Sequence, residues 1–115
     1  MSRDPECLFC RIAAGQIPAD LVAETERVVA FRDLAPVAPT HALVIPRDHY
    51  ANAAELAAAE PETLAELLSV ADRVAAADGL PGYRLVFNTG VAAQQSVFHV
   101  HLHVIGGRDV TWPPG

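Results

Sequence analysis

Apolar residues occur along this chain in short runs, each bounded by turn-forming residues, in the first half and again near the end. Such runs are typical of β-strands. The pattern predicts five strands, at residues 21–24, 28–33, 40–46, 83–87 and 97–105. The third ends at Pro46, because proline cannot donate to a sheet ladder.

Between the third and fourth predicted strands the apolar residues are spaced differently. Apolar residues after Pro61 recur every three or four positions and form one stripe, which predicts a long amphipathic helix. Pro61 suits its first turn, and Gly79 closes it. Residues 7–14 predict a short helix closed by Gly15, and residues 53–59 a short helix or turn. Strands broken by one long helix indicate an α+β fold with an antiparallel sheet.

Length and charge narrow the possible functions. The 115 residues predict a single domain, residues 1–115, with a core modest enough to favour pairing with a second copy. The net charge is −6, and all eight basic residues are arginine. An acidic chain is a poor ligand for long nucleic acids, and without lysine it cannot form a Walker-type phosphate loop. A mononucleotide remains possible, because backbone amides and histidines can hold one phosphate.

The chain has no apolar run approaching the ~20 residues of a membrane span, and its first residues do not resemble a secretory signal. We therefore expect a cytoplasmic protein without a membrane partner. In that compartment thiols stay reduced, so the two cysteines are a metal or redox pair before they are a disulfide.

Histidine occupies every second position near the end of the chain, at His99, His101 and His103. Because side chains alternate along a strand, the three imidazoles would share one face, while the aliphatic residues between them face the core. Burying three imidazoles without partners would be costly, which favours a functional site.

The row has two other interpretations. A solvated face that is rich in histidine by chance fits poorly, since the chain has only five histidines. A metal held by all three is geometrically awkward, because same-face neighbours lie ~7 Å apart while metal–nitrogen bonds measure ~2.0–2.1 Å. One or two of them could still bind a metal. A neutral imidazole is also a competent nucleophile toward phosphorus, and its neighbours can donate to phosphate oxygens.

The segment from His99 to Ile105 resembles the His-φ-His-φ-His-φ-φ signature of the histidine triad (HIT) superfamily, where φ is an apolar residue. Segments 31–33, 38–46, 83–88 and 112–115 resemble the Hint branch, so the likeness covers nearly the whole chain. It implies a HIT-like fold: a five-stranded antiparallel sheet with one long and one short helix, paired into a two-fold dimer.

The resemblance also implies hydrolysis of purine nucleoside 5′-phosphoramidates and related AMP or GMP conjugates, with no cofactor required for catalysis. His101 would be the nucleophile and form a covalent nucleotidyl intermediate. His103 would contact the phosphate oxygens, His41 would support and orient His101, and Ser96 would contact the phosphate or the leaving group.

Further residues would bind the nucleotide. By the resemblance, Asp33 would hydrogen-bond the ribose, Leu34 would line the base pocket, and Asn88 would line the phosphate site. Taken alone, Asp33, Asn88 and Ser96 would be ordinary turn or loop residues. Gln94 stands where the family usually has glycine, which places the geometry of that loop in question.

The Cys7-x-x-Cys10 pair has two interpretations besides a pair of buried thiols. A redox motif would follow a strand, and too few residues precede Cys7 to form one. A zinc site needs two further ligands, and His49 and His99 are available. Several bacterial members of the resembling family bind zinc in this way. We therefore expect Cys7, Cys10, His49 and His99 to form a structural zinc site.

The closing Trp112-Pro113-Pro114-Gly115 is apolar and stiff, so we expect it to dock on another surface, either of its own subunit or of a partner. In the resembling family this tail shapes a substrate site within a homodimer. Two alternatives to the phosphoramidase remain at this stage. One is cleavage of dinucleoside polyphosphates or nucleotidyl transfer, and the other is a nucleotide-binding or interaction protein with vestigial activity.

Overall fold

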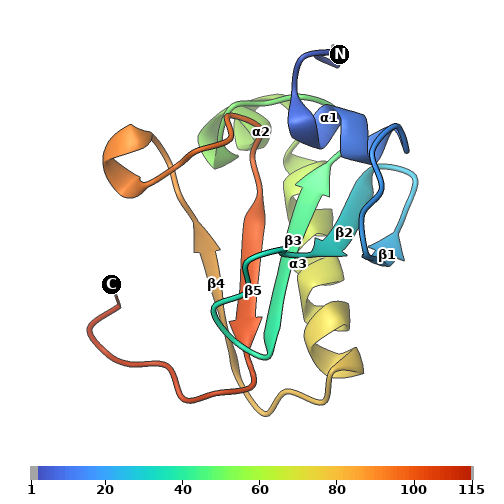
Figure 1. Ribbon diagram of the computed structural model, residues 1–115. Helices are drawn as coiled ribbons and strands as arrows, with labels where there is room; N and C mark the ends of the chain where they lie inside the picture. Colours follow the sequence, from blue (N-terminus) through green and yellow to red (C-terminus); the bar gives the residue numbers. More distant parts are fainter. Residues whose placement is uncertain (1–2, 115) are drawn as a thin grey trace.

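The computed structural model describes residues 3–114 and shows one antiparallel sheet with helices on both of its faces (Figure 1). The strands pair in the order β1-β2-β3-β5-β4. In chain order the elements of this range are α1 (Leu8–Ala13), β1 (Leu21–Glu24), β2 (Val28–Arg32), β3 (Thr40–Pro46), α2 (Ala53–Ala59), α3 (Pro61–Ala77), β4 (Tyr83–Phe87), a 3-10 helix (Val91–Ala93) and β5 (Leu102–Gly106).

The α+β prediction with a five-stranded antiparallel sheet is confirmed. The stretch expected to be a helix or a turn is a second short helix, α2, beside the short α1 and the long α3. Both predicted glycine caps have positive φ, 75° at Gly15 and 69° at Gly79. Among residues 3–114 no helix is long and apolar enough to cross a bilayer.

The start of the last strand was predicted wrongly. The sequence predicts a strand over residues 97–105, whereas β5 begins only at Leu102. The amide of Val100 explains the difference, because it donates to the carbonyl of Tyr50 at 2.7 Å rather than to a neighbouring strand. His99 and His101 therefore lie in an irregular segment, and of the three histidines in the row His103 alone belongs to the sheet ladder.

Each face of the sheet packs against its own apolar cluster. On one face, α3 and α2 cover alternate residues of β2, β3 and β5, and Val100, Leu102 and Val104 belong to this core. On the opposite face, α1 packs over Phe31, Leu43 and other residues of β2 and β3. Because α1 is short, it leaves β5 without a helix over it on this second face (Figure 1). His103 lies on this face, opposite Leu43 in the sheet.

Asp78 joins the end of α3 to the middle of the sheet. Its carboxylate accepts two hydrogen bonds from the Arg32 guanidinium, at 2.7 and 2.9 Å, and one from the Thr40 hydroxyl at 2.6 Å. These bonds hold the pKa of Asp78 at about 2, below its ordinary value of 3.8. Asp78 thus fixes the helix relative to β2 and β3, the strand that carries His41.

We predict that Asp78→Asn lowers the free energy of unfolding at pH 7 by about 1–2 kcal/mol, because charge-assisted bonds to a partly buried carboxylate are lost. A carboxyl group with a depressed pKa stabilises the fold above its unfolded pKa and loses that effect as pH falls through its folded pKa. The difference between wild type and variant should therefore shrink between pH 4 and about 2. Urea unfolding across this range measures it, and a difference that stays constant would contradict the assignment.

Candidate functional site

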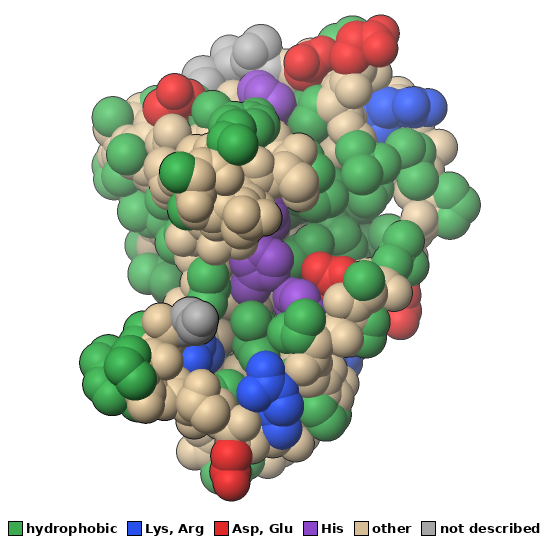
Figure 2. All heavy atoms as spheres, turned by 60° about the vertical axis from the view of Figure 1, so that its left-hand side comes forward, with side chains coloured by type: hydrophobic (Ala, Val, Ile, Leu, Met, Phe, Trp, Pro, Cys, Tyr) green, Lys and Arg blue, Asp and Glu red, His purple; other side chains and the backbone are tan. Residues whose placement is uncertain are grey.

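Figure 2 shows histidine side chains in a hollow of the surface, with apolar side chains and an acidic group beside them. The rings of His101 and His103 meet edge to face, with centroids 5.0 Å apart. The aliphatic residues between the histidines are buried against α3, so the predicted separation of the two faces is confirmed.

The backbone fixes which nitrogen of His101 carries the proton. Its Nδ1 lies 2.9 Å from the carbonyl oxygen of His99, and only an N–H can donate to that oxygen. In the neutral ring Nε2 is therefore left with a free lone pair. The ring is 7% exposed, and burial lowers the pKa of His101 below its ordinary value of 6.5. His101 is thus a neutral imidazole with its nucleophilic nitrogen unprotonated.

A second chain of hydrogen bonds sets the tautomer of His103. The amide of Val37 donates to Nδ1 of His41 at 3.1 Å, so the proton of His41 is on Nε2. That Nε2 lies 2.9 Å from Nδ1 of His103 and donates to it. In neutral His103 the proton is then on Nε2. Hence His41 contacts His103, the neighbour of the histidine that it was expected to orient.

Nε2 of His103 is a buried polar atom with no hydrogen-bond partner within residues 3–114. Burial, together with the nearby rings of His101 and His41, lowers the pKa of His103 to about 4. The ring is therefore neutral and offers one N–H donor. Leaving a buried donor unsatisfied costs about 1–3 kcal/mol, which an acceptor on a ligand would recover.

Asp33 lies beside His41 where β2 leads into the connection to β3. One carboxylate oxygen accepts the amide of Ala35 at 2.8 Å, and the other lies 3.4 Å from Nε2 of His41. Asp33, His41 and His103 have possible metal-ligand atoms within 4.8 Å of one another. Both nitrogens of His41 are already in hydrogen bonds, however, so His41 and His103 form a hydrogen-bonded pair with Asp33 beside it, rather than a ligand set.

An apolar cavity of about 250 Å³ opens next to the histidines, between α1 and the end of β2. Phe9 and Val97 are among its lining residues, and Phe9 also contacts the ring of His101, with centroids 5.0 Å apart. Asp33 and Leu34 line the cavity too, and Leu34 is 98% exposed. The structure thus brings both predicted nucleoside-binding residues to one cavity beside His101, while their roles stay predictions.

The remaining predicted residues lie in the connection between β4 and β5. Asn88 is half-buried where β4 ends, and Ser96 is exposed on the rim of a second hollow that His49 and Phe98 also line. Gln94 adopts the left-handed conformation, with φ of 70°, that the family's usual glycine would permit without strain. The backbone of this loop is thus compatible with a glycine at this position.

Gln95 is a structural residue that the sequence did not single out. It is 4% exposed, its side-chain oxygen accepts the amide of Gly90, and its side-chain nitrogen donates to the carbonyls of Ala51 and Val97. The three bonds hold both ends of the loop that carries Ser96. The only sequence signal was its position beside Ser96, since burial of a glutamine cannot be read from periodicity.

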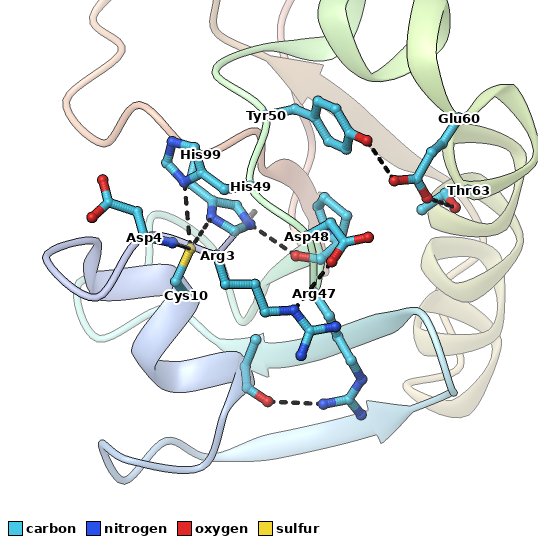
Figure 3. A network of polar contacts seen from close by, with 12 residues as sticks. Arg3, Asp4, Cys10, Arg47, Asp48, His49, Tyr50, Glu60, Thr63 and His99 are labelled. Carbon is cyan, nitrogen blue, oxygen red and sulfur yellow. Dashed lines mark hydrogen bonds and ion pairs between the residues drawn. The ribbon is translucent and has the colours of Figure 1, made fainter. Parts of the chain in front are cut away.

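The four residues expected to bind zinc come together at the start of α1. Cys7, Cys10, His49 and His99 have their ligand atoms within 4.8 Å of one another. Nδ1 of His99 lies 3.4 Å from both sulfur atoms, and Nδ1 of His49 lies 3.4 Å from that of Cys10 (Figure 3). Arg3 and Asp48, joined at 3.1 Å, tie the chain before α1 to the segment that carries His49.

The donor set fits a tetrahedral zinc ion. Zinc bonds of about 2.3 Å to sulfur and about 2.0–2.1 Å to nitrogen place sulfur and nitrogen atoms about 3.6 Å apart, close to the observed separations. Nε2 of His99 donates to the carbonyl of Pro46 at 2.8 Å, which leaves the lone pair of Nδ1 directed at the thiols. The amides of Asp4 and Cys10 point at the sulfurs of Cys10 and Cys7, as donors around bound thiolates do.

Burial raises the pKa of the Cys10 thiol to about 11 and lowers the pKa of His99 to about 4. Without an ion the thiol is protonated and the imidazole neutral. Metal binding would therefore displace a proton from Cys10, as is usual for thiolate sites.

Comparison with known proteins agrees with this geometry. The HIT domain family matches residues 14–110. An uncharacterized HIT-like protein of Synechococcus elongatus is 47% identical over 116 residues, covering all of both chains. The 14 kDa zinc-binding protein of Zea mays is 45% identical over 115 residues, covering 97% of this chain and 90% of the maize protein.

A solved structure shows the same fold. The HIT family hydrolase from Legionella pneumophila superposes with a TM-score of 0.91 and is 50% identical, covering 96% of this chain and 100% of that one. The sequence and structure comparisons therefore agree over almost the whole described chain. This chain belongs to the HIT domain family.

Proposed function

We propose that the protein is a phosphoramidase that hydrolyses purine nucleoside 5′-phosphoramidates and related AMP or GMP conjugates through a covalent nucleotidyl-His101 intermediate. The observation that carries the proposal is the pairing of an unprotonated nitrogen with an unused donor. Nε2 of His101 has a free lone pair, and Nε2 of the adjacent His103 has a buried N–H without a partner. A nucleophile and a donor side by side suit an α-phosphate.

In the first step Nε2 of His101 attacks the α-phosphorus, the phosphorus–nitrogen bond breaks, and the amine leaves after taking a proton from solvent water. The imidazole then carries a positive charge, which the carbonyl of His99 stabilises through the bond from Nδ1–H. His103 donates to a phosphate oxygen on which charge accumulates. Water then attacks phosphorus, the bond to Nε2 breaks, and the mononucleotide is released with His101 restored.

The apolar cavity supports a nucleoside as the other half of the substrate. Its walls are mostly apolar side chains, which suit a flat base, and Asp33 lies on its edge toward His41. With Asp33 bound to the ribose hydroxyls, a base in the cavity would leave the 5′-phosphate directed to the histidines. The closing Trp-Pro-Pro-Gly supports the Hint branch, and hence phosphoramidates over dinucleoside polyphosphates.

We predict that His101→Asn lowers the turnover of AMP-morpholidate on the order of 10³-fold or more, because the attacking nitrogen is lost. The dissociation constant for AMP, measured by calorimetry, should change little, since the cavity is intact. Mass spectrometry of quenched wild-type protein should show a nucleotidyl adduct on His101. Normal turnover by the variant, or an adduct on another residue, would refute the mechanism. Faster cleavage of diadenosine polyphosphate than of AMP-morpholidate would refute the substrate class.

We propose that zinc is the ion of the Cys/His cluster and that its role is structural. Four protein ligands close the coordination shell, which leaves no position for substrate. The ion would cross-link α1 to the end of β3 and to the segment before β5, both of which pack few residues against this short helix. The reduced thiols that the site requires accord with a cytoplasmic location.

We predict about one zinc ion per chain in the purified protein, measured by elemental analysis, and a lower melting temperature after chelation. Cys10→Ser should lose most of the metal, because the sulfur of Cys10 faces both histidines. Asp78→Asn is the control, since it weakens the fold far from the cluster and should keep its zinc. Full zinc content in Cys10→Ser would contradict the ligand assignment.

We propose that the protein is a homodimer. In the described part of the chain, β4 is an edge strand, and Tyr83 and Leu85 expose much of their surface. Trp112 is 82% exposed and so does not pack on its own subunit. An open edge and an exposed tryptophan are surfaces that a second copy would cover.

We expect sedimentation analysis at micromolar concentration to give twice the mass of one chain. Leu85→Glu should shift the protein toward monomer, because it places a charge on the open strand, whereas Leu68→Glu on the exposed side of α3 should not. A wild-type protein that sediments as a monomer would contradict the proposal.

A further inference from the structure

His99 belongs to two sites at once. Its ring faces the sulfurs of Cys7 and Cys10, while its carbonyl oxygen accepts the bond from Nδ1 of His101. The ring is fully buried and its second nitrogen is bound to the carbonyl of Pro46. One residue therefore connects the Cys/His cluster directly to the catalytic imidazole.

We propose that His99 is a positioning residue for nucleotidyl transfer, so that occupancy of the Cys/His cluster by metal sets the orientation and tautomer of His101. This inference rests on the proposed function of His101 as the nucleophile. It assigns the cluster an effect on the rate of the reaction, in addition to its cross-linking role.

The backbone around His99 is the reason to expect this coupling, because its carbonyl is not held by the sheet. In a strand, ladder hydrogen bonds would hold the carbonyl of His99 whatever its side chain did. The pairing of β5 with β3 and β4 stops at Leu102, so no ladder bond fixes that carbonyl. Its position depends on nearby anchors: the bond from Val100 to Tyr50, the bond from Gln95 to Val97, and the ring of His99 itself. Of these, only the ring changes its attachment when a metal binds.

Phe9 supplies a second connection between the cluster and His101. It lies between the two cysteines in α1, is 6% exposed, and meets the rings of His99 and His101 edge to face at 6.1 and 5.0 Å. When a metal holds Cys7 and Cys10, it also holds the turn of helix that carries Phe9. Phe9 then restrains the plane of the His101 ring from the side opposite to the sheet.

The coupling predicts that loss of the metal affects the rate of the reaction more than the affinity for nucleotide. α1 supplies only part of the cavity lining, and the sheet and the connections beside it supply the rest, so nucleotide affinity should depend on metal less than the rate does. The attack by Nε2 needs the ring of His101 in one orientation, so the rate should depend strongly on it. Loss of a contact that orients a functional side chain from behind typically lowers activity on the order of 10- to 100-fold.

The test compares zinc-loaded protein with protein stripped by a chelator, at a temperature where circular dichroism shows both folded. Three quantities are measured: the dissociation constant for AMP, the single-turnover rate of adduct formation from AMP-morpholidate, and the ring N–H resonance of His101 in protein labelled with ¹⁵N-histidine. Stripping should slow adduct formation on the order of 10- to 100-fold, change AMP affinity far less than the rate, and lose the Nδ1–H resonance to solvent exchange. Zinc should restore the rate and the resonance.

Two variants keep the test decisive. If the stripped protein unfolds, His49→Asn replaces it, because this change removes a ligand that does not contact His101 and leaves His99 and both thiols in place. Asp78→Asn, which destabilises the fold at a remote position, should keep the wild-type rate per folded molecule. A rate that falls equally in Asp78→Asn would show that stability alone is responsible and would overturn the coupling.

An unchanged rate without metal also overturns the inference. The resonance separates this failure from a failure of the proposed function. If zinc-loaded wild type forms no adduct, the proposed reaction is wrong, and the His101 resonance alone then decides the coupling. Its persistence in stripped protein counts against the coupling, and its loss supports it.

Discussion

The antiparallel pairing of β3 with β5 is the constraint on which the site depends. Leu43 lies opposite His103 and His41 opposite Ile105, so the two histidines are diagonal neighbours on the same face of the sheet. That register brings their rings within hydrogen-bonding distance. A slip of one residue would turn the histidines of one strand toward α3 and bury them in the aliphatic core.

The rest of the fold keeps this face partly open. On the opposite face α3 spans the sheet, and Asp78 anchors its end to Arg32 and Thr40. On the site face the six residues of α1, with Ala19 and Val97 beside them, pack on β2 and β3. The cavity and the histidine pair are found where this short layer ends. The functional site is therefore a consequence of incomplete coverage, with Phe9 as its boundary.

Most of the fold could be predicted from local patterns. The bounds of β3, α2 and β4 agree with the apolar runs, and β2 ends one residue earlier than expected. Periodicity predicts these elements correctly because each strand buries alternate residues, and each helix every third or fourth residue, against one core. It failed at residues 97–101, where the amide of Val100 bonds to Tyr50, a contact between segments that are distant in sequence.

The site was predictable in its members but less so in its connections. Alternation placed His99, His101 and His103 on the side away from the aliphatic core, and the Cys7–Cys10 pair did meet His49 and His99. The bond from His41 to His103 depends on ring directions that only the folded chain defines. Periodicity did not indicate Gln95, since its three partners are backbone groups, two in its own loop and one at the distant Ala51.

The amide of Val37 sets the tautomers of two histidines, although it is hydrogen-bonded to one of them, His41. A main-chain N–H sets the tautomer of His41, and His41 in turn sets the tautomer of His103. The positions of these protons therefore depend on the backbone conformation between Pro36 and Pro39. Substitution of the Val37 side chain would leave that arrangement intact, because the hydrogen bond comes from the backbone N–H. Remodelling of the loop, even with every histidine retained, would reverse the hydrogen bond from His41 to His103 and turn Nε2 of His103 from a donor into an acceptor.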